Sequence, residues 1–190
     1  MAILYGVVEG VKVYIEGYAT YQFHKDKEAL ELAIRKAIEK VAGIFARAQP
    51  ELARNGVVVR PIYPYRDLGL NVDWKWTITS TATNETNPGT LLSKTLSEKQ
   101  ALVIFGLKFF DVNPIVKHIG FKKGTMKTAM IDVYAEKDEE GKIILRHQVA
   151  WAPKETVEIL YTASTTGDLY MAILGFIAEP KAETADWVEE

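Results

Sequence analysis

The sequence predicts a mainly β protein (α+β by content), folded as an antiparallel β-sandwich with an N-terminal β-hairpin and one long amphipathic helix. Three observations support this class. From residue 57 onward, short runs rich in β-branched residues follow one another, with turn signals between them at roughly 8–12-residue spacing. The first 16 residues alternate like a hairpin, and only one segment has a helical period.

The hairpin is predicted from residues 2–8, a Glu-Gly turn at positions 9–10 and a second strand after it. In that strand Val11, Val13 and Ile15 alternate with Lys12, Tyr14 and Glu16. A period of two is typical of a strand with one buried face. We therefore expect these three aliphatic side chains to share one face.

The helix is predicted over residues 26–55. Its apolar positions recur every three or four residues, which places them on one stripe. They are Leu30, Ile34, Ile38, Val41 and Phe45. Asp26 is the expected N-cap, and Pro50 is expected to kink or end the helix.

Most of the remaining chain reads as strands. Residues 72–78 alternate around Trp74 and Trp76, and residues 101–110 form an apolar run expected to be buried on both faces. Further strands are expected over residues 57–62, 115–121, 128–135, 142–151, 157–162 and 169–177.

The length of 190 residues suits a single domain over 1–190. Within it we distinguish a hairpin, helix and strands (1–92), a β-sandwich body (93–180) and a polar tail (181–190). The net charge of −2 argues against a nucleic-acid partner held by a basic stripe. No run is long and apolar enough to span a membrane, and no signal peptide is apparent, so we expect the protein to be cytoplasmic when synthesised.

No catalytic, nucleotide-binding or metal-binding motif is recognisable, and the chain has no cysteine. We therefore expect no enzyme activity, no catalytic residue, no cofactor and no metal. One alternative is a metal-dependent hydrolase in which Asp67 and Asp73 hold the ion beside Lys75, because carboxylates hold Mg²⁺ in such enzymes. The other alternative, which ranks ahead of the hydrolase, is a carbohydrate- or small-ligand-binding module with a platform of aromatic side chains that includes Trp74 and Trp76.

The two ends of the chain suggest docking segments. An isolated hairpin is only marginally stable in water, so the first segment must pack on its own helix, on the β body or on another subunit. Pairing with another subunit would satisfy exposed strand edges. The candidate assembly residues are Val11, Val13, Ile15, Tyr18, Tyr21, Phe23, Trp187 and Val188.

Residues 101–106, 131–134, 149–153 and 167–180 carry a resemblance in strand pattern and turn placement. They resemble the strand run of coat (capsid) proteins with a jelly-roll body from viruses of thermophilic archaea and bacteria. The resemblance covers residues 100–180. It implies a jelly-roll-like sandwich and a self-assembling structural protein of the virion that performs no catalysis. Its partners would be further copies of itself and other virion proteins.

Overall fold

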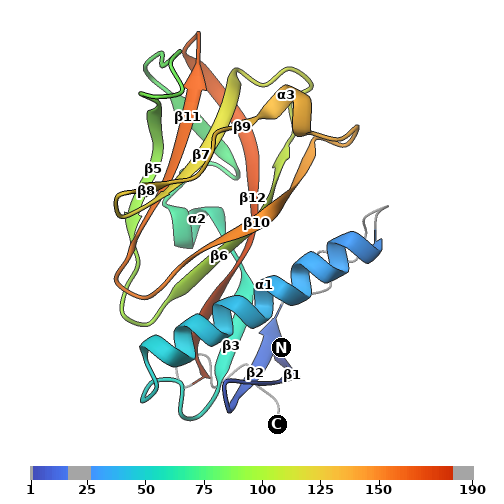
Figure 1. The fold of residues 1–190 in the computed structure, drawn as a ribbon, viewed down its shortest axis with the longest axis vertical. Helices are drawn as coiled ribbons and strands as arrows, with labels where there is room; N and C mark the ends of the chain where they lie inside the picture. Colours follow the sequence, from blue (N-terminus) through green and yellow to red (C-terminus); the bar gives the residue numbers. More distant parts are fainter. Residues whose placement is uncertain (1, 17–26, 182–190) are drawn as a thin grey trace.

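The structure, a computed structural model, describes residues 2–16 and 27–181 (Figure 1). It confirms a mainly β protein with two largely antiparallel sheets and few helices. The strands are β1 (Ala2–Val8), β2 (Val11–Glu16), β3 (Val57–Pro61), β4 (Lys75–Ile78), β5 (Gly89–Thr95), β6 (Ala101–Phe109), β7 (Val116–Lys123), β8 (Met126–Lys127), β9 (Ile131–Asp132), β10 (Lys142–Trp151), β11 (Thr156–Ala163) and β12 (Gly167–Pro180). The helices are α1 (Lys27–Ala48), α2 (Pro64–Leu68) and α3 (Val133–Glu136).

The larger sheet has the order β1-β2-β3-β12-β6-β10, and β4 pairs with the upper part of β12. The smaller sheet has the order β5-β11-β7-β8, with β9 also paired to β7. Every pairing is antiparallel except that of β2 with β3. Because β3 and β4 both bond to β12, strands from either side of residue 92 share one sheet.

The main core lies between the two sheets. Leu107 and Ile173 from the larger sheet meet Ile119, Phe121 and Ile159 from the smaller one, and all five side chains are buried. Fully burying an aliphatic or aromatic side chain of this size stabilises the fold by roughly 1.5–3 kcal/mol. This layer therefore holds the two sheets face to face.

A second core lies on the outer face of the larger sheet, where α1 crosses its lower half (Figure 1). Ile38 and Phe45 of the helix are completely buried against residues that include Val59, Phe105 and Phe176. The rings of Phe105 and Phe176 stack with their centroids 5.6 Å apart. Helix and smaller sheet together bury both faces of β6 and β12, as the continuous apolar runs of these strands require.

The helix ends earlier than the sequence predicts. α1 stops at Ala48, because Pro50 disfavours a helical backbone at the residue before it. A series of turns then leads to Gly56, whose φ of 113° a residue with a side chain rarely adopts. The expected N-cap, Asp26, lies outside the described residues.

Two strand predictions are corrected. The strand expected over residues 72–78 begins only at Lys75, because the φ of 52° at Trp74 lies outside the range of a β-strand. The strand expected over residues 128–135 shrinks to β9, and α3 follows it directly. The carboxylate of Asp132 accepts a hydrogen bond from the backbone N–H of Ala135 at 3.1 Å and so starts this short helix.

The hairpin of β1 and β2 closes through Glu9 and Gly10, which both have positive φ (51° and 74°). Two such residues in a two-residue loop match the twist of antiparallel strands. β2 then runs parallel to β3, with Val13 opposite Val57. The hairpin therefore extends the larger sheet beyond the sandwich.

A buried charge cluster ties β3 to α2 and β12. Arg60 is fully buried; its guanidinium donates to both carboxylate oxygens of Asp67 at 2.7 and 2.8 Å and to Glu179 at 2.8 Å. Gln100 donates to Glu179 at 3.1 Å, and the backbone N–H of Tyr63 donates to Asp67 at 2.6 Å. The buried charged groups of the cluster thus have hydrogen-bond partners, and removing one charge would leave the opposite charge buried without its partner.

Replacing Arg60 tests this dependence. Arg60→Ala leaves Asp67 and Glu179 buried without their cation, and we expect it to lower the free energy of unfolding by about 3–5 kcal/mol. Arg66, whose side chain is largely exposed and 3.8 Å from Glu179, is the matched control, and Arg66→Ala should cost no more than about 1 kcal/mol. Urea unfolding followed by circular dichroism measures both. Equal losses in the two variants would contradict the account.

The same cluster predicts the acid sensitivity of the protein. Burial alone would raise the pKa of Glu179, but the hydrogen bonds and charge of Arg60 outweigh burial and lower that pKa below its ordinary 4.5. The unfolded chain then binds a proton more readily than the folded one, so stability falls as the pH drops below about 4.5. We expect the unfolding midpoint to drop between pH 5 and pH 3, and to drop less in Glu179→Gln. An equal drop in both proteins would rule out this origin.

Candidate functional site

The outer edge of the larger sheet is formed by β1, and no other described strand pairs with it. Its aliphatic side chains are unusually open to solvent: Ile3 is 64% exposed, Leu4 54% and Val7 68%. A strand edge presents unpaired backbone N–H and C=O groups in a row. An apolar edge of this kind is a template for pairing with another strand.

Both faces of β1 carry these apolar groups. Ile3 lies opposite Ile15, which packs toward the helix-side core, so Ile3 lies on the α1 face of the sheet. Leu4 lies opposite Tyr14 and therefore on the other face. A partner strand beside β1 would cover apolar side chains on both sides of the sheet.

Polar contacts with α1 hold the hairpin in place. The hydroxyl of Tyr5 donates to Glu39 at 2.9 Å, and Arg47 forms an ion pair with Glu9 at 2.8 Å. Leu32, two helical turns before Glu39, is a further exposed aliphatic residue on this side of the helix. The edge is thus presented by an anchored hairpin.

The structure places the predicted assembly residues of β2 against the protein's own core. Val13 is completely buried, and Val11 and Ile15 are partly buried against the helix-side core. Because α1 covers the face that they share, Val13 is not available to a partner, and Val11 and Ile15 are accessible only in part. The other predicted residues lie outside the described part of the chain: Tyr18, Tyr21, Phe23, Trp187 and Val188.

The exposed residues of β1 were missed because period-two alternation identifies a buried face but not an edge. A usable signal is present in the sequence, since residues 2–8 contain aliphatic side chains at consecutive positions on both faces. A strand apolar on both faces must be covered on both. The described elements cover only part of β1.

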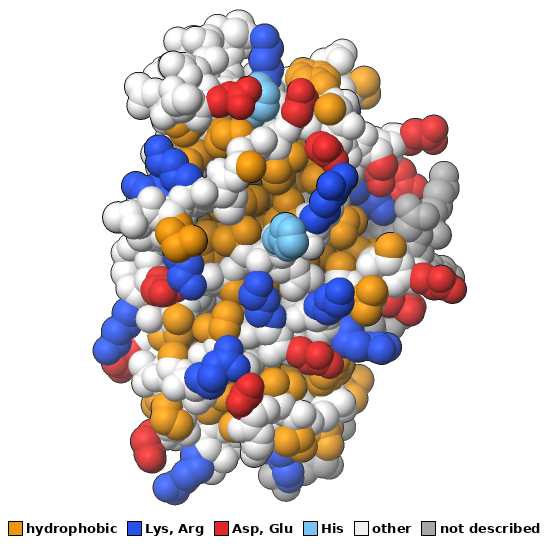
Figure 2. All heavy atoms as spheres, in the orientation of Figure 1, with side chains coloured by type: hydrophobic (Ala, Val, Ile, Leu, Met, Phe, Trp, Pro, Cys, Tyr) orange, Lys and Arg blue, Asp and Glu red, His pale blue; other side chains and the backbone are white. Residues whose placement is uncertain are grey.

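A second feature is an apolar groove of about 530 Å³ between β10 and the β7–β9 edge of the smaller sheet. Its lining residues are Phe121, Thr128, Ala129, Met130, Ile131, Asp132, Glu136, Ile143, Ile144, Leu145, Arg146, His147 and Val149. Figure 2 shows a band of apolar side chains in the upper part of this face, with basic side chains gathered beside and below it. The volume lies within the roughly 300–1,000 Å³ of ligand pockets.

The groove lies beside a break in β10. The pairing of β10 with β6 skips from Ile144 to Val149, so the residues between them leave the ladder. The side chain of Gln148 donates to the backbone oxygen of Ala33 in α1 at 2.7 Å, and Lys40 donates to the backbone oxygen of Gln148 at 2.8 Å. These two bonds draw the bulge toward the helix.

The region around Gln148 is positively charged. Partial burial and the nearby charge of Lys123 lower the pKa of Lys40. Lys40 has no carboxylate partner within the described part of the chain, and its ammonium group donates to the backbone oxygen of Gln148. Lys40 and Lys123 therefore lie close enough to interact beside the break in β10.

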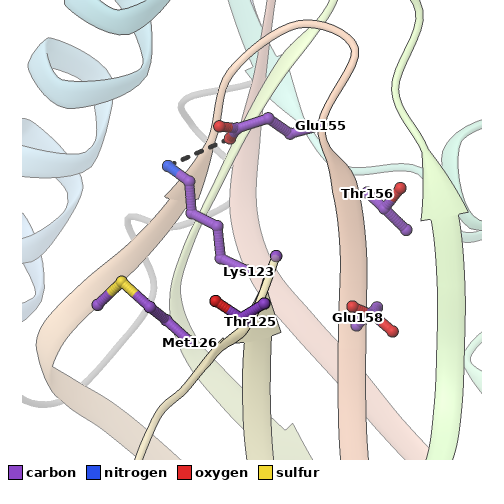
Figure 3. A pocket seen from close by; sticks show the side chains of 7 residues that line it. Lys123, Thr125, Met126, Glu155, Thr156 and Glu158 are labelled. Atoms are coloured by element: carbon purple, nitrogen blue, oxygen red, sulfur yellow. Dashed lines mark ion pairs between the residues drawn. The ribbon is translucent and has the colours of Figure 1, made fainter.

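A wide, open hollow of about 600 Å³ lies next to the hairpin of β7 and β8 (Figure 3). Lys123 reaches across it to Glu155 at 3.1 Å, as the dashed line in the figure marks, and also donates to the backbone oxygen of Ala150. Glu158 faces Lys122 at 3.8 Å. The charged side chains that line the hollow are thus paired within the protein.

The residues of the hydrolase and ligand alternatives are not brought together. Asp67 is buried with both carboxylate oxygens bonded to Arg60, whereas Asp73 is exposed. Trp76 is a core residue whose indole N–H donates to the backbone oxygen of Met171 at 2.7 Å. Trp74 packs partly into both cores. These positions do not form the predicted metal site or aromatic platform.

One constellation resembles a catalytic triad in composition. His118 Nδ1 is hydrogen-bonded to the hydroxyl of Thr162 at 2.8 Å, and its Nε2 lies 3.0 Å from Glu85. Thr162 is only 2% exposed, which leaves a substrate no access to its hydroxyl. The arrangement instead ties the loop carrying Glu85 to β7 and β11. Within residues 2–16 and 27–181, no group of three or more His, Asp or Glu side chains is placed to hold a metal ion.

No helix in these same ranges has the apolar length needed to cross a membrane. Comparison with protein-family models, curated proteins and solved structures gives no match for this chain. The geometry of β1 and of the groove therefore carries the functional argument.

Proposed function

We propose that this protein is a self-assembling structural subunit, a coat-type protein whose copies associate by pairing their β1 strands edge to edge. The observation that carries the proposal is the exposed apolar edge, with Ile3, Leu4 and Val7 open to solvent on both faces of the sheet. Soluble proteins usually blunt such edges with charges, proline or covering segments. β1 contains none of the charged residues or prolines that would block pairing.

Pairing of two β1 strands would join the larger sheets of two copies. A strand of seven residues is about 23 Å long, enough for several backbone hydrogen bonds across the contact. An antiparallel pairing of identical strands is isologous, because each copy contributes the same surface. It would produce a continuous sheet across a two-fold axis.

The energetics favour assembly through several contacts rather than through β1 alone. Burying the exposed parts of Ile3, Leu4 and Val7 in two copies would contribute about 6–11 kcal/mol, since full burial is worth roughly 1.5–3 kcal/mol for each side chain. Association costs about 4–15 kcal/mol in lost freedom of motion. The β1 contact by itself is therefore weak, which suits a subunit that assembles at high concentration with additional contacts.

We also infer that the two sheets form a jelly roll. The strand orders support this: β3-β12-β6-β10 lies against β5-β11-β7-β8, and the chain passes between the two sheets repeatedly from β4 to β12. Jelly rolls occur in viral coat proteins but also in lectins and cupins. The fold is thus compatible with a virion coat, and the exposed edge favours that role over the others.

Charge placed on the edge should block assembly. We expect the wild-type protein to associate as its concentration rises, and Val7→Lys to require at least a tenfold higher concentration. Each lysine places a charge on the apolar edge, and charged side chains on edge strands block pairing with another strand. Sedimentation velocity over a concentration series, with negative-stain microscopy of the largest species, measures the effect.

Val72→Lys is the matched control, because Val72 is also an exposed valine (51%) but lies outside β1. It should associate like the wild type, and all three proteins should have the same circular dichroism spectrum. The proposal fails if the wild type remains a monomer at every concentration, or if the two lysine variants lose association equally.

A further inference from the structure

The groove beside β10 and residues 182–190 have complementary properties. Residues 182–190 contain two large apolar side chains, Trp187 and Val188, set among acidic residues. The groove offers apolar walls, with Arg146 and His147 on the β10 side and Asp132 and Glu136 on the side of α3. We propose that the groove between β10 and the β7–β9 edge binds residues 182–190 of a neighbouring copy, with Trp187 and Val188 as the buried anchors. This inference rests on the proposed self-assembly and supplies a second contact for it.

The apolar part of the groove suits such anchors. Met130 and Ile131 line one wall, and Leu145 and Val149 line the other, while Phe121 and Ile143 of the sandwich core lie between them. All four wall residues are only partly buried. An aromatic side chain buries about 150–250 Å² on docking and dominates the energy of a contact. A tryptophan and a valine would therefore cover most of this exposed apolar surface.

The charges agree with the same occupant. Arg146 and His147 line the β10 side and have no ion-pair partner among the described residues. The segment 182–190 has four acidic residues and no basic one. Asp132 and Glu136 also line the groove, at the end next to α3, and Asp132 is engaged in capping that helix. Acidic residues around Trp187 would therefore lie along the β10 wall, away from α3.

The reach of the chain favours a neighbouring copy over the protein's own segment. Lys181 lies six residues beyond Gly175, which is level with Val149 through Ile104. Six strand residues span about 20 Å, and β10 lies two strands or about 10 Å to the side, which gives a direct separation of about 22 Å. Residues 182–187 span at most about 22 Å when fully extended. The protein's own Trp187 would therefore need a straight and fully extended chain to reach the groove, whereas a neighbouring copy places no such demand on residues 182–187.

Disulfide trapping tests the contact cleanly, because the chain has no cysteine of its own. One full-length copy carries Ala185→Cys, which keeps both anchors, and a second, tagged copy carries Ala129→Cys in the groove. The control partner carries Thr79→Cys, an exposed site outside the groove. Mixed copies are oxidised and the linked heterodimer is followed on a non-reducing gel.

We expect the groove pair to link at least tenfold faster than the control pair. Adding Trp187→Ala to the first copy, or Arg146→Glu to the second, should remove most of that difference. Linking no faster than the control would overturn the inference. A chain carrying both cysteines that links only within itself, while mixed copies do not link, would overturn it as well.

The outcome separates this contact from β1 pairing. If Val7→Lys disrupts assembly but the cysteines do not link, the tail contact alone is wrong. If the cysteines link while Val7→Lys leaves sedimentation unchanged, the β1 pairing alone is wrong.

Discussion

The central strands of the larger sheet, β6 and β12, are buried on both faces, and the rest of the architecture depends on this constraint. Strands β6 and β12 are apolar along nearly their whole length, so one covering layer cannot shield them from water. The smaller sheet covers the inner face, and α1 covers the lower half of the outer face. The helix is therefore a structural layer of the sandwich and not an appendage to it.

The same constraint explains where the molecule exposes its edge. Covering the outer face with α1 requires a sheet wide enough to receive the helix, and the hairpin supplies this width by adding β2 and β1 beside β3. The widened sheet then ends in β1, whose inner neighbour packs on the helix while its outer side meets solvent. The candidate assembly surface is thus a consequence of how the helix is accommodated.

The sequence predicts local structure here better than it predicts exposure. The turn at Glu9-Gly10 and the doubly buried strand over residues 101–109 follow from turn chemistry and an unbroken apolar run. Val13 was expected at an interface because its alternation marks a buried face, but alternation does not say which neighbour buries it. Asp67 could not be recognised as a partner of Arg60 and Glu179, because that cluster joins residues up to 119 positions apart. Asp132 overrode a strand pattern because its side chain caps α3.

An isologous β1 contact and a heterologous contact between residues 182–190 and the groove would serve different purposes. The first closes on itself in pairs, whereas the second repeats from copy to copy and forms rings or open arrays. A shell or lattice needs both kinds of contact. The β1 contact is modest in energy, which would allow incorrectly joined copies to separate and rejoin.

Hydrogen exchange of the backbone amides of β1 as a function of protein concentration tests the central claim most directly. Edge pairing predicts that exchange in residues 2–8 slows as the protein associates, while exchange in the already buried β6 is unchanged. If residues 2–8 exchange at the same rate at every concentration while the protein associates, β1 is not the contact, and the account of assembly is wrong.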